Sequence, residues 1–349
     1  MNPKPTNILV IRLSALGDVA MIIPVLRAFT ATYPHVKITV LSKPFHEPLF
    51  KEFKKVQFYP ADVKGKHKGL NGLFRLSKDF KKQGITAVAD LHNVLRSNVM
   101  GGYFKLNNIP VVKIDKGRAE KKALTRSKNK DFRPLKTAIE RYAEVFEKLG
   151  YPIDLSTHQF PLRKQIPGKV IPLFDNTYKK HFGIAPFAAH TGKMYPMDLM
   201  DEVIAELDKE KQVQIFLFGG GKQEETVLNE IAQKYNSVTN LAGTLSFDQE
   251  LAMISNLDAM LAMDSGNAHL AAIYNVPTIT IWGVTHPNAG FYPFNQPMEN
   301  ALLADRELFP LIPTSIYGNT FPKGYENAIK TISPQHIIDK LKKVLNLNI

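Results

Sequence analysis

The chain has 349 residues, of which 44% are hydrophobic and 22% charged, and it contains no cysteine. At about 150 residues per domain, this length predicts two domains that each bury a core. The composition excludes intrinsic disorder, and no stretch approaches the ~20 apolar residues that span a membrane. The missing cysteines exclude disulfides, thiolate metal sites and cysteine nucleophiles. The amino terminus lacks the zones of a signal peptide, so we expect a cytoplasmic protein.

The net charge of +13 is distributed unevenly along the chain. Residues 1–163 contain 30 Lys and Arg against 13 Asp and Glu, a net charge of +17. Residues 164–349 contain 15 against 19, a net charge of −4. The basic half is therefore expected to meet an anionic partner. Nucleic acid, a membrane surface and an acidic glycolipid all stay open on charge alone.

Strands and helices alternate along both halves. In the first half, the patterns predict strands at 7–12, 36–41, 87–91 and 111–114 and helices at 19–33 and 134–150. In the second half, they predict strands at 181–186, 213–218, 259–263 and 278–282 and helices at 197–207, 224–235, 267–274 and 334–347. This alternation is typical of parallel sheets, so we expect an α/β protein with two doubly wound domains facing a cleft.

The domain boundary is expected at residues 160–179, where Pro161, Pro167, Gly168 and Pro172 cluster. The predicted domains are therefore residues 1–163 and residues 164–333. For the final helix, about residues 334–349, packing back on the first domain is left open.

The loop RLSALGDV, residues 12–19, follows the first predicted strand and opens a helix. Ligands of open α/β sheets bind at the carboxyl ends of the strands, so Gly17 and Asp18 are expected to meet a substrate. A plain turn at Gly17 and a helix cap at Asp18 explain the same residues. The loop carries no G-x-G-x-x-G, and the chain has neither a Walker pattern nor a D-x-D pair, which disfavours nicotinamide, P-loop and metal-assisted chemistry.

Four loops of the second half follow predicted strands in the same way. Lys193 in FAAHTGKMYP suits a phosphate, and Gly219–Gly221 allow a ligand to approach the backbone closely. Asp264–Gly266 open a helix, with His269 one turn further, and Gly283–Pro287 form another turn. Each loop alone fits a surface turn or a structural histidine. Together they predict a pocket of nucleotide size.

Four segments, in this order over about residues 7–295, resemble glycosyltransferase family 9, the ADP-heptose:lipopolysaccharide heptosyltransferases: RLSALGDVAMIIPVL, ADLHNVLRS, APFAAHTGKMYP and DSGNAHLAAIYNVPTITIWGVTHP. The resemblance implies a GT-B fold of two Rossmann-like domains, an amino-terminal one for the acceptor and a carboxy-terminal one for the sugar nucleotide. It also implies inversion at the anomeric carbon, no required metal and no cofactor, with ADP-heptose as co-substrate.

The resemblance assigns roles to residues that match the family motifs. Asp18 is implied as the general base. The donor and nucleotide are implied to contact Thr191, Lys193, Gly220, Glu224, Leu245, Asp264, Ser265, Gly266 and His269. The acceptor is implied to contact Ser14, Gly17, His92, Arg96, Arg118 and Lys121. The sequence departs from the family at Met194-Tyr195, where a Trp usually precedes the proline.

We therefore expect an inverting heptosyltransferase that acts on an anionic lipopolysaccharide core acceptor. An enzyme that uses another nucleotide sugar on a surface polysaccharide is the main alternative. A nucleic-acid-binding protein is disfavoured because no RNP, helix-turn-helix or zinc-finger pattern occurs. A solute-binding protein is disfavoured because no export signal occurs.

The expected location is the cytoplasm of a Gram-negative bacterium, peripheral at the cytoplasmic face of the inner membrane, without a nucleic-acid partner. Acceptor docking and membrane attachment are expected from basic residues of the first half, namely Lys64, Lys66, Lys68, Lys116, Arg118, Lys121, Lys122, Arg126 and Lys128.

Overall fold

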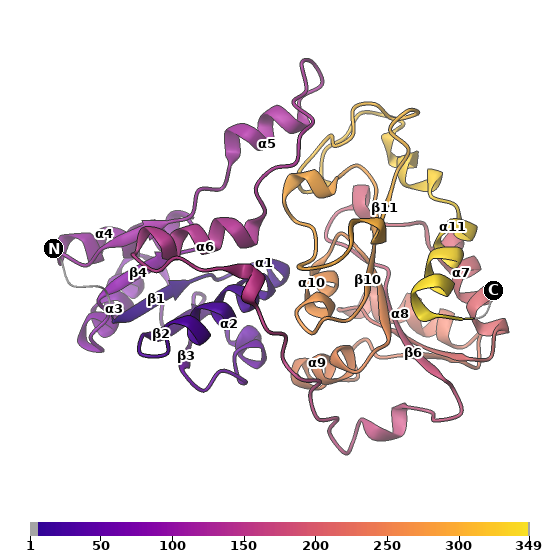
Figure 1. Ribbon diagram of the computed structural model, residues 1–349, viewed down its shortest axis with the longest axis horizontal. Coiled ribbons are helices and arrows are strands. Elements are labelled where there is room, and N and C mark those ends of the chain that lie inside the picture. Colours follow the sequence, from indigo (N-terminus) through magenta and orange to yellow (C-terminus); the bar gives the residue numbers. More distant parts are fainter. Residues whose placement is uncertain (1–5, 348–349) are drawn as a thin grey trace. The chain divides into compact units, whose positions relative to one another are not determined.

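The computed structural model describes residues 6–347 and divides into two compact units. Unit 1 comprises residues up to 116 together with 136–160, and unit 2 comprises 117–135 together with the residues from 161 on. Each unit is built on one parallel sheet flanked by helices (Figure 1). The α/β class and the two doubly wound domains are therefore confirmed.

Unit 1 has a five-stranded sheet with the order β3-β2-β1-β4-β5. Its strands are β1 (Asn7–Ile11), β2 (Lys37–Ser42), β3 (Val56–Pro60), β4 (Ala87–Asp90) and β5 (Val111–Lys113). Its helices are α1 (Leu16–Ala20), α2 (Ile22–Thr32), α3 (Gly69–Lys82), α4 (Leu95–Leu106) and α6 (Ala138–Lys148), with short 3₁₀ turns η1 (Pro44–Leu49) and η2 (Leu155–Thr157).

The central strand β1 shows why this sheet is covered on both faces. Its sequence NILVI is aliphatic throughout, and all residues but the first are buried. Leu9 and Ile11 pack in a cluster with α3 and α4. Helices α2 and α6 pack against each other, and the ring centroids of Phe29 and Phe146 lie 4.9 Å apart. Because all five strands run parallel, the residues that follow β1 and β4 lie at one edge of the sheet.

Unit 2 has a six-stranded sheet with the order β11-β10-β9-β6-β7-β8. Its strands are β6 (Lys180–Ala185), β7 (Val213–Leu217), β8 (Val238–Asn240), β9 (Ala259–Met263), β10 (Thr278–Trp282) and β11 (Ala301–Leu303). Its helices are α5 (Arg118–Thr125), α7 (Met197–Lys209), α8 (Lys222–Ala232), α9 (Phe247–Ser255), α10 (Gly266–Ala272) and α11 (Pro334–Leu345). Its 3₁₀ turns are η3 (Ile171–Leu173), η4 (Thr191–Lys193), η5 (Pro287–Ala289), η6 (Met298–Asn300) and η7 (Tyr325–Thr331).

The final helix α11 packs in unit 2. Its apolar stripe of Ile337, Leu341 and Leu345 is buried in the same cluster as Val203 and Leu207 of α7. The expectation that residues 334–349 pack back on the first domain is therefore wrong for the part that the structure describes. The physical reason is that α7 presents an apolar stripe that α11 completes.

Residues 117–135 also depart from the predicted division at residue 163. This segment starts and ends next to unit 1 in sequence but packs on unit 2, where Leu124, Leu135 and Ala289 form a small core. Lys130 Nζ donates to the carbonyls of Leu124 and Pro313, both at 2.8 Å. Burial, with Arg306 nearby, lowers the pKa of Lys130 to about 8.

The regrouping changes the charge of each domain. Residues 1–116 and 136–160 contain 22 Lys and Arg against 11 Asp and Glu, which leaves unit 1 with a net charge of +11. Unit 2 contains the other 23 against 21, a net charge of +2. Unit 1 is still the basic domain, but part of the basic half belongs to the other one.

Several elements differ from the sequence predictions. The helix predicted over 19–33 is two helices, α1 and α2, which meet at Met21. Helices α3, α4, α5 and α9 and strands β3, β8 and β11 were not predicted. Glycines weaken the helical patterns of α3 and α4, α5 and α9 have only 8 and 9 residues, and edge strands carry weak patterns. Within residues 6–347, no helix combines the length and apolar character that crossing a bilayer requires.

Candidate active site

Asp18 lies in the first turn of α1, at the carboxyl edge of the unit 1 sheet. Its Oδ2 accepts the backbone N–H of Ala15 at 3.1 Å, so the carboxylate caps its own helix. The side chain keeps 25% exposure. The cap predicted for Asp18 is thus present, and it leaves the carboxylate accessible from the edge of the sheet.

Arg12 is the partner that the sequence analysis did not anticipate for Asp18. Its Nη2 lies 2.5 Å from Asp18 Oδ2, and its Nη1 donates to the carbonyl of Leu91 at 2.7 Å. The guanidinium also lies over the ring of Tyr142, 5.9 Å from the centroid, and the Tyr142 hydroxyl donates to the carbonyl of Asp18 at 3.2 Å. The available signal was a charged residue directly after the apolar strand NILVI.

His92 and Ser14, both predicted to contact the acceptor, lie next to each other. His92 Nδ1 accepts the backbone N–H of Leu13 at 3.4 Å, and Nε2 lies 3.5 Å from Ser14 Oγ. Burial, together with the charges of Arg12 and Lys116, lowers the pKa of His92 to about 4. The ring is therefore neutral at pH 7, and its hydrogen is assigned to Nε2, facing the Ser14 hydroxyl.

The other predicted acceptor residues are placed differently. Gly17 lies in α1 next to Asp18, whereas Arg96 is exposed in the first turn of α4. Arg118 and Lys121 belong to α5 in unit 2, and Lys121 Nζ lies 4.2 Å from the ring centroid of Phe291. Their assignment to the amino-terminal domain is corrected, because α5 packs on unit 2.

In unit 2, Lys193 and Asp264 form the central pair of the predicted donor site. Lys193 Nζ lies 2.8 Å from Asp264 Oδ2 and donates to the Asp264 carbonyl at 3.1 Å. Lys193 ends η4, which follows β6, and Asp264 follows β9. Because β6 and β9 are parallel neighbours, the structure brings these two predicted residues together at one edge.

Glycines allow the chain to approach Lys193 closely. A Cβ on Gly318 would lie 2.6 Å from Lys193 Cγ, and Gly318 has a φ of +75°. A Cβ on Gly192 would lie 2.6 Å from the Gly318 carbonyl oxygen. The loop around Gly318 therefore holds the lysine side chain, a role that the sequence analysis missed.

The remaining predicted donor residues follow Asp264 or precede Lys193 in the chain. Ser265 precedes α10, and its buried Oγ finds no hydrogen-bond partner among residues 6–347. Gly266 and His269 lie in α10, and His269 is buried. Thr191 is exposed at the start of η4. A buried hydroxyl without a protein partner is costly.

The glycine turn after β7 has a defined local structure. Glu224 accepts the Gly220 N–H at 2.7 Å, so this carboxylate already closes the turn. Glu225, the neighbouring acid, lies against Gly243, two residues before the predicted nucleotide contact Leu245. The structure thus places Gly220 and Leu245 in the loops after β7 and β8, and Glu224 in the first turn of α8, at the carboxyl edge of the same sheet.

The family departure at Tyr195 falls on a core residue. Tyr195 is 1% exposed, and its hydroxyl donates to the Ile332 carbonyl at 2.6 Å.

Two further residues at the carboxyl edge of the unit 2 sheet were not predicted individually, Thr285 and His286, which follow β10. Both are buried, and burial with Arg306 nearby lowers the pKa of His286 to about 4.

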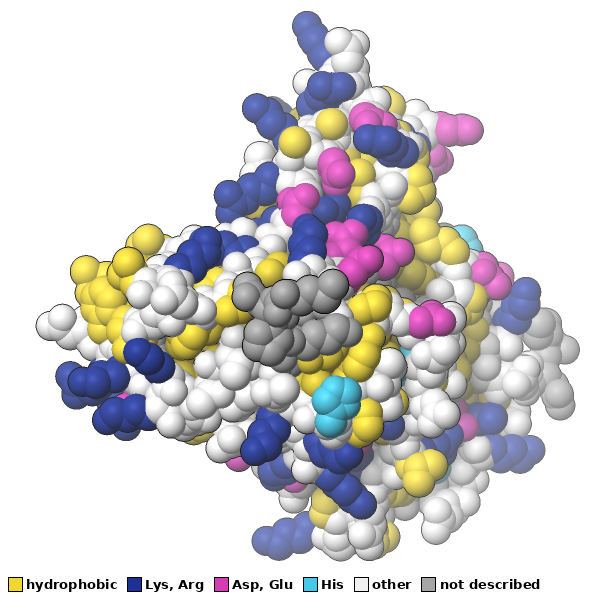
Figure 2. All heavy atoms as spheres, turned by 60° about the vertical axis from the view of Figure 1, so that its left-hand side comes forward, with side chains coloured by type: hydrophobic (Ala, Val, Ile, Leu, Met, Phe, Trp, Pro, Cys, Tyr) yellow, Lys and Arg dark blue, Asp and Glu magenta, His cyan; other side chains and the backbone are white. Residues whose placement is uncertain are grey.

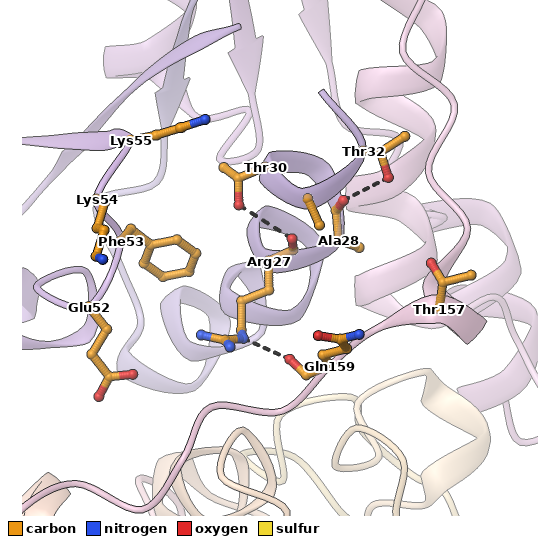
Figure 3. A pocket seen from close by; sticks show the side chains of 11 residues that line it. Arg27, Ala28, Thr30, Thr32, Glu52, Phe53, Lys54, Lys55, Thr157 and Gln159 are labelled. Carbon is orange, nitrogen blue, oxygen red and sulfur yellow. Dashed lines mark hydrogen bonds between the residues drawn. The ribbon is translucent and has the colours of Figure 1, made fainter. Parts of the chain in front are cut away.

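A cavity of about 520 Å³ opens elsewhere on unit 1 (Figure 3). It lies where α2 ends and before β3 begins, which is the amino edge of the sheet, opposite to Asp18. Arg27 Nε donates there to the carbonyl of Gln159 at 2.8 Å. The cavity is therefore separate from the predicted acceptor site. In the part of the chain that the structure describes, no three His, Asp or Glu side chains are grouped to hold a metal.

Comparisons with known proteins identify the family of the chain. The family model of glycosyltransferase family 9, the heptosyltransferases, matches residues 73–307. The lipopolysaccharide core heptosyltransferase OpsX of Haemophilus influenzae is 23% identical over 81% of this chain and 80% of its own.

Solved structures show the same fold. A family 9 glycosyltransferase of Veillonella parvula superposes with a TM-score of 0.76 at 16% identity, over 98% of both chains. The ADP-heptose lipopolysaccharide heptosyltransferase II of Escherichia coli superposes with a TM-score of 0.66 at 20% identity, over 97% of this chain and 98% of its own. The fold is the GT-B fold of these heptosyltransferases. The chain therefore belongs to glycosyltransferase family 9, the heptosyltransferase family.

Proposed function

We propose that this enzyme transfers heptose from ADP-heptose to the core of a lipopolysaccharide acceptor, with inversion at the anomeric carbon. The observation that carries the proposal is the Asp18 carboxylate, held at an accessible sheet edge in a chain of this family. The names of its relatives support the donor and the acceptor.

Asp18 is the proposed general base. Its Oδ2 is engaged by Arg12 and by the Ala15 N–H, so Oδ1 is the atom that takes the proton of the acceptor hydroxyl. The deprotonated oxygen then forms a bond to the anomeric carbon as the bond to the β-phosphate oxygen breaks and ADP leaves. Attack from the face opposite to the leaving group inverts the configuration. Arg12 orients the carboxylate for this step, and Tyr142 contacts the Arg12 guanidinium and the backbone carbonyl of Asp18.

The acceptor hydroxyl needs a second contact for orientation. The neutral His92 ring and the Ser14 hydroxyl are within reach of one another at this edge and offer a donor and an acceptor. We propose that they bind neighbouring hydroxyls of the acceptor sugar. This role requires the neutral form of His92, which its lowered pKa provides.

The negative charge on the departing diphosphate is proposed to be stabilised by Lys193. In the structure this ammonium pairs with Asp264, which keeps its position fixed. A phosphate oxygen that joins the pair gains a charge-assisted hydrogen bond, and Ser265 Oγ supplies a further donor. With these groups, transfer is proposed to need no metal ion or other cofactor.

Transfer of heptose from ADP-heptose to a heptose-deficient lipopolysaccharide core tests the proposal. Release of ADP and formation of the inverted linkage, read by NMR of the product, are the expected result, unchanged by a chelator. UDP-sugars serve as the competing donors. Preference for a UDP-sugar or retention of the anomeric configuration would overturn the proposal. We further propose that the acceptor is met at the cytoplasmic face of the inner membrane.

A further inference from the structure

Helix α3 carries an apolar stripe that faces away from the core. Leu73, Leu76 and Phe80 are buried against the sheet of unit 1. Leu70 and Phe74, four residues apart, are 61% and 44% exposed. Residues at i and i+4 share one side of a helix, so these two side chains form a continuous outer stripe.

Helix α4 continues this apolar surface. Leu95 and Leu106 are 80% and 85% exposed, and a spacing of 11 residues, about three turns, puts them on one side of the helix. Tyr103 of α4 contacts Phe74 of α3 at 6.1 Å between ring centroids, so the two stripes meet. We call the surface of Leu70, Phe74, Leu95, Tyr103 and Leu106 the α3–α4 face.

Cations surround the α3–α4 face. Between residues 61 and 107 the chain has three acidic residues against nine basic ones, Lys64, Lys66, Lys68, Arg75, Lys78, Lys81, Lys82, Arg96 and Lys105. Of the acids, Asp90 is buried, and Asp62 accepts the backbone N–H groups of Gly65 and Lys66. Most of the positive charge is therefore available to an anionic partner.

Figure 2 brings forward the side of unit 1 on which α3 and α4 are labelled in Figure 1. Yellow apolar side chains gather on this surface, and dark blue Lys and Arg side chains lie beside them. Apolar side chains framed by Lys and Arg are typical of surfaces that rest in a membrane interface, where the apolar groups enter the acyl boundary and the cations meet anionic headgroups.

We propose that the α3–α4 face docks the enzyme on an anionic lipid bilayer. The helices α3 and α4 begin at Gly69 and Leu95, after β3 and β4, and therefore at the same carboxyl edge of the sheet as Asp18. A bilayer against this face lies beside the edge where a lipid-anchored acceptor is needed. In this respect the inference rests on the proposed function.

The first test is flotation with vesicles of phosphatidylethanolamine containing about one-third phosphatidylglycerol. The wild-type enzyme binds them, and the double variant Leu70→Gln/Phe74→Gln lowers the partition coefficient about tenfold or more, because two apolar side chains no longer enter the acyl boundary. The control Leu162→Gln/Leu308→Gln changes two exposed leucines of unit 2 and leaves binding unchanged. Equal loss in both variants would overturn the inference.

The second test removes charge. Arg75→Gln/Lys78→Gln lowers binding about fivefold for each removed charge, and the loss disappears at high salt. Lys323→Gln/Lys330→Gln, at exposed positions of unit 2, is the matched control and binds as the wild type does. Equal binding to vesicles of phosphatidylcholine alone would contradict docking on an anionic bilayer.

Further measurements distinguish the bilayer from two other partners of the α3–α4 face, a second copy of the chain and single-stranded RNA. If Leu70→Gln/Phe74→Gln abolishes a dimer in sedimentation, the face is an interface between copies and the inference fails. If the wild-type enzyme prefers single-stranded RNA to vesicles, it fails as well. Transfer to a lipid-free core acceptor separates this inference from the proposed function: the variant keeps that activity, whereas an inactive wild-type enzyme that still binds vesicles contradicts only the function.

Discussion

Arg12 and Asp18 form a close ion pair at the edge of the unit 1 sheet, with Arg12 Nη2 at 2.5 Å from Asp18 Oδ2. The guanidinium comes from the residue directly after β1, and the carboxylate comes from the first turn of α1. The side chain of Arg12 is 9% exposed and that of Asp18 is 25% exposed. One partner is thus buried, and the other is accessible at the edge of the sheet.

Substitution of Asp18 by Asn tests the general base. Asparagine retains an oxygen that can accept the Ala15 N–H, so the fold is expected to persist, while the amide cannot take a proton. We expect kcat to fall by about 10²- to 10⁴-fold. Asp339→Asn, on the exposed side of α11, is the control. Transfer that survives in Asp18→Asn would assign the base elsewhere.

Substitution of Arg12 by Met tests whether Arg12 stabilises the fold through its contacts with Leu91 and Asp18. The change leaves the Leu91 carbonyl and one side of the Asp18 carboxylate without their donor, so we expect a loss of about 2–4 kcal/mol in the free energy of unfolding. Urea denaturation measures it. Arg133→Gln breaks an exposed ion pair with Asp131 and should cost less than about 1 kcal/mol. Similar losses in the two variants would show that Arg12 is not a structural partner.

Substitution of Lys193 by Ala tests the diphosphate contact. We expect the Kd for ADP, measured by calorimetry, to rise about 10- to 100-fold, the value of one charge-assisted hydrogen bond. Lys222→Ala, at the start of α8 after the glycine turn, is the control and should change the Kd less than about twofold. An unchanged affinity in Lys193→Ala would remove this lysine from the donor site.

Two glycines with positive φ, of which only Gly318 lies against Lys193, give a matched pair of variants. Gly318→Ala and Gly324→Ala both place a Cβ in the left-handed region and should each cost about 1 kcal/mol of stability. Only the Cβ on Gly318 collides with Lys193 Cγ, whereas nothing lies within 4 Å of a Cβ on Gly324. We therefore expect weaker ADP binding in Gly318→Ala alone. Equal affinities would mean that this loop does not position the lysine.

Because three buried histidines stay neutral in the folded state, we expect the free energy of unfolding to decrease in acid. Burial lowers the pKa of His46, His92 and His286 to about 4 each, with contributions from Lys43, Arg12 and Arg306, respectively. The unfolded histidines bind protons below about pH 6.5 that the folded ones do not, so this stability is complete above about pH 6.5 and is lost as the pH falls toward 4.

The loss should reach up to about 3 kcal/mol for each histidine, read from urea midpoints at several pH values. His46→Gln should reduce the pH dependence, and His336→Gln, at an exposed position of α11, should leave it unchanged. A urea midpoint that stays constant between neutral pH and about pH 5 would contradict the prediction.

The predicted elements that the structure confirms share a strong local pattern. The strands β9 and β10 have the predicted bounds, because each is a run of five buried residues, AMLAM and TITIW, with no amphipathic alternative. Edge strand β3, VQFYP, is half-exposed and ends in proline, so its pattern is weak. Helix α5 has one buried residue, Leu124, and its place on unit 2 depends on contacts with residues far away in the chain.

The candidate site shows the same difference. Asp18, Lys193, Asp264 and Ser265 lie between the end of a strand and the first turns of the next helix, where parallel sheets collect their ligands. Arg12 and Gly318 were missed because their roles depend on partners from other segments: Arg12 is held by Leu91 and Tyr142, and Gly318 lies against Lys193. A single sequence does not show which distant residues make such contacts.

The sequence by itself therefore determined the two α/β domains, the strand-following loops that carry the site, and the uneven distribution of charge. These depend on local periodicity and composition, which are written in consecutive residues. Only the tertiary structure decided that residues 117–135 and α11 belong to unit 2, that unit 1 has a net charge of +11, and that Arg12 supports Asp18. These depend on which apolar surfaces and charges meet across large sequence separations, where burial and pairing energies act between segments that no local pattern connects.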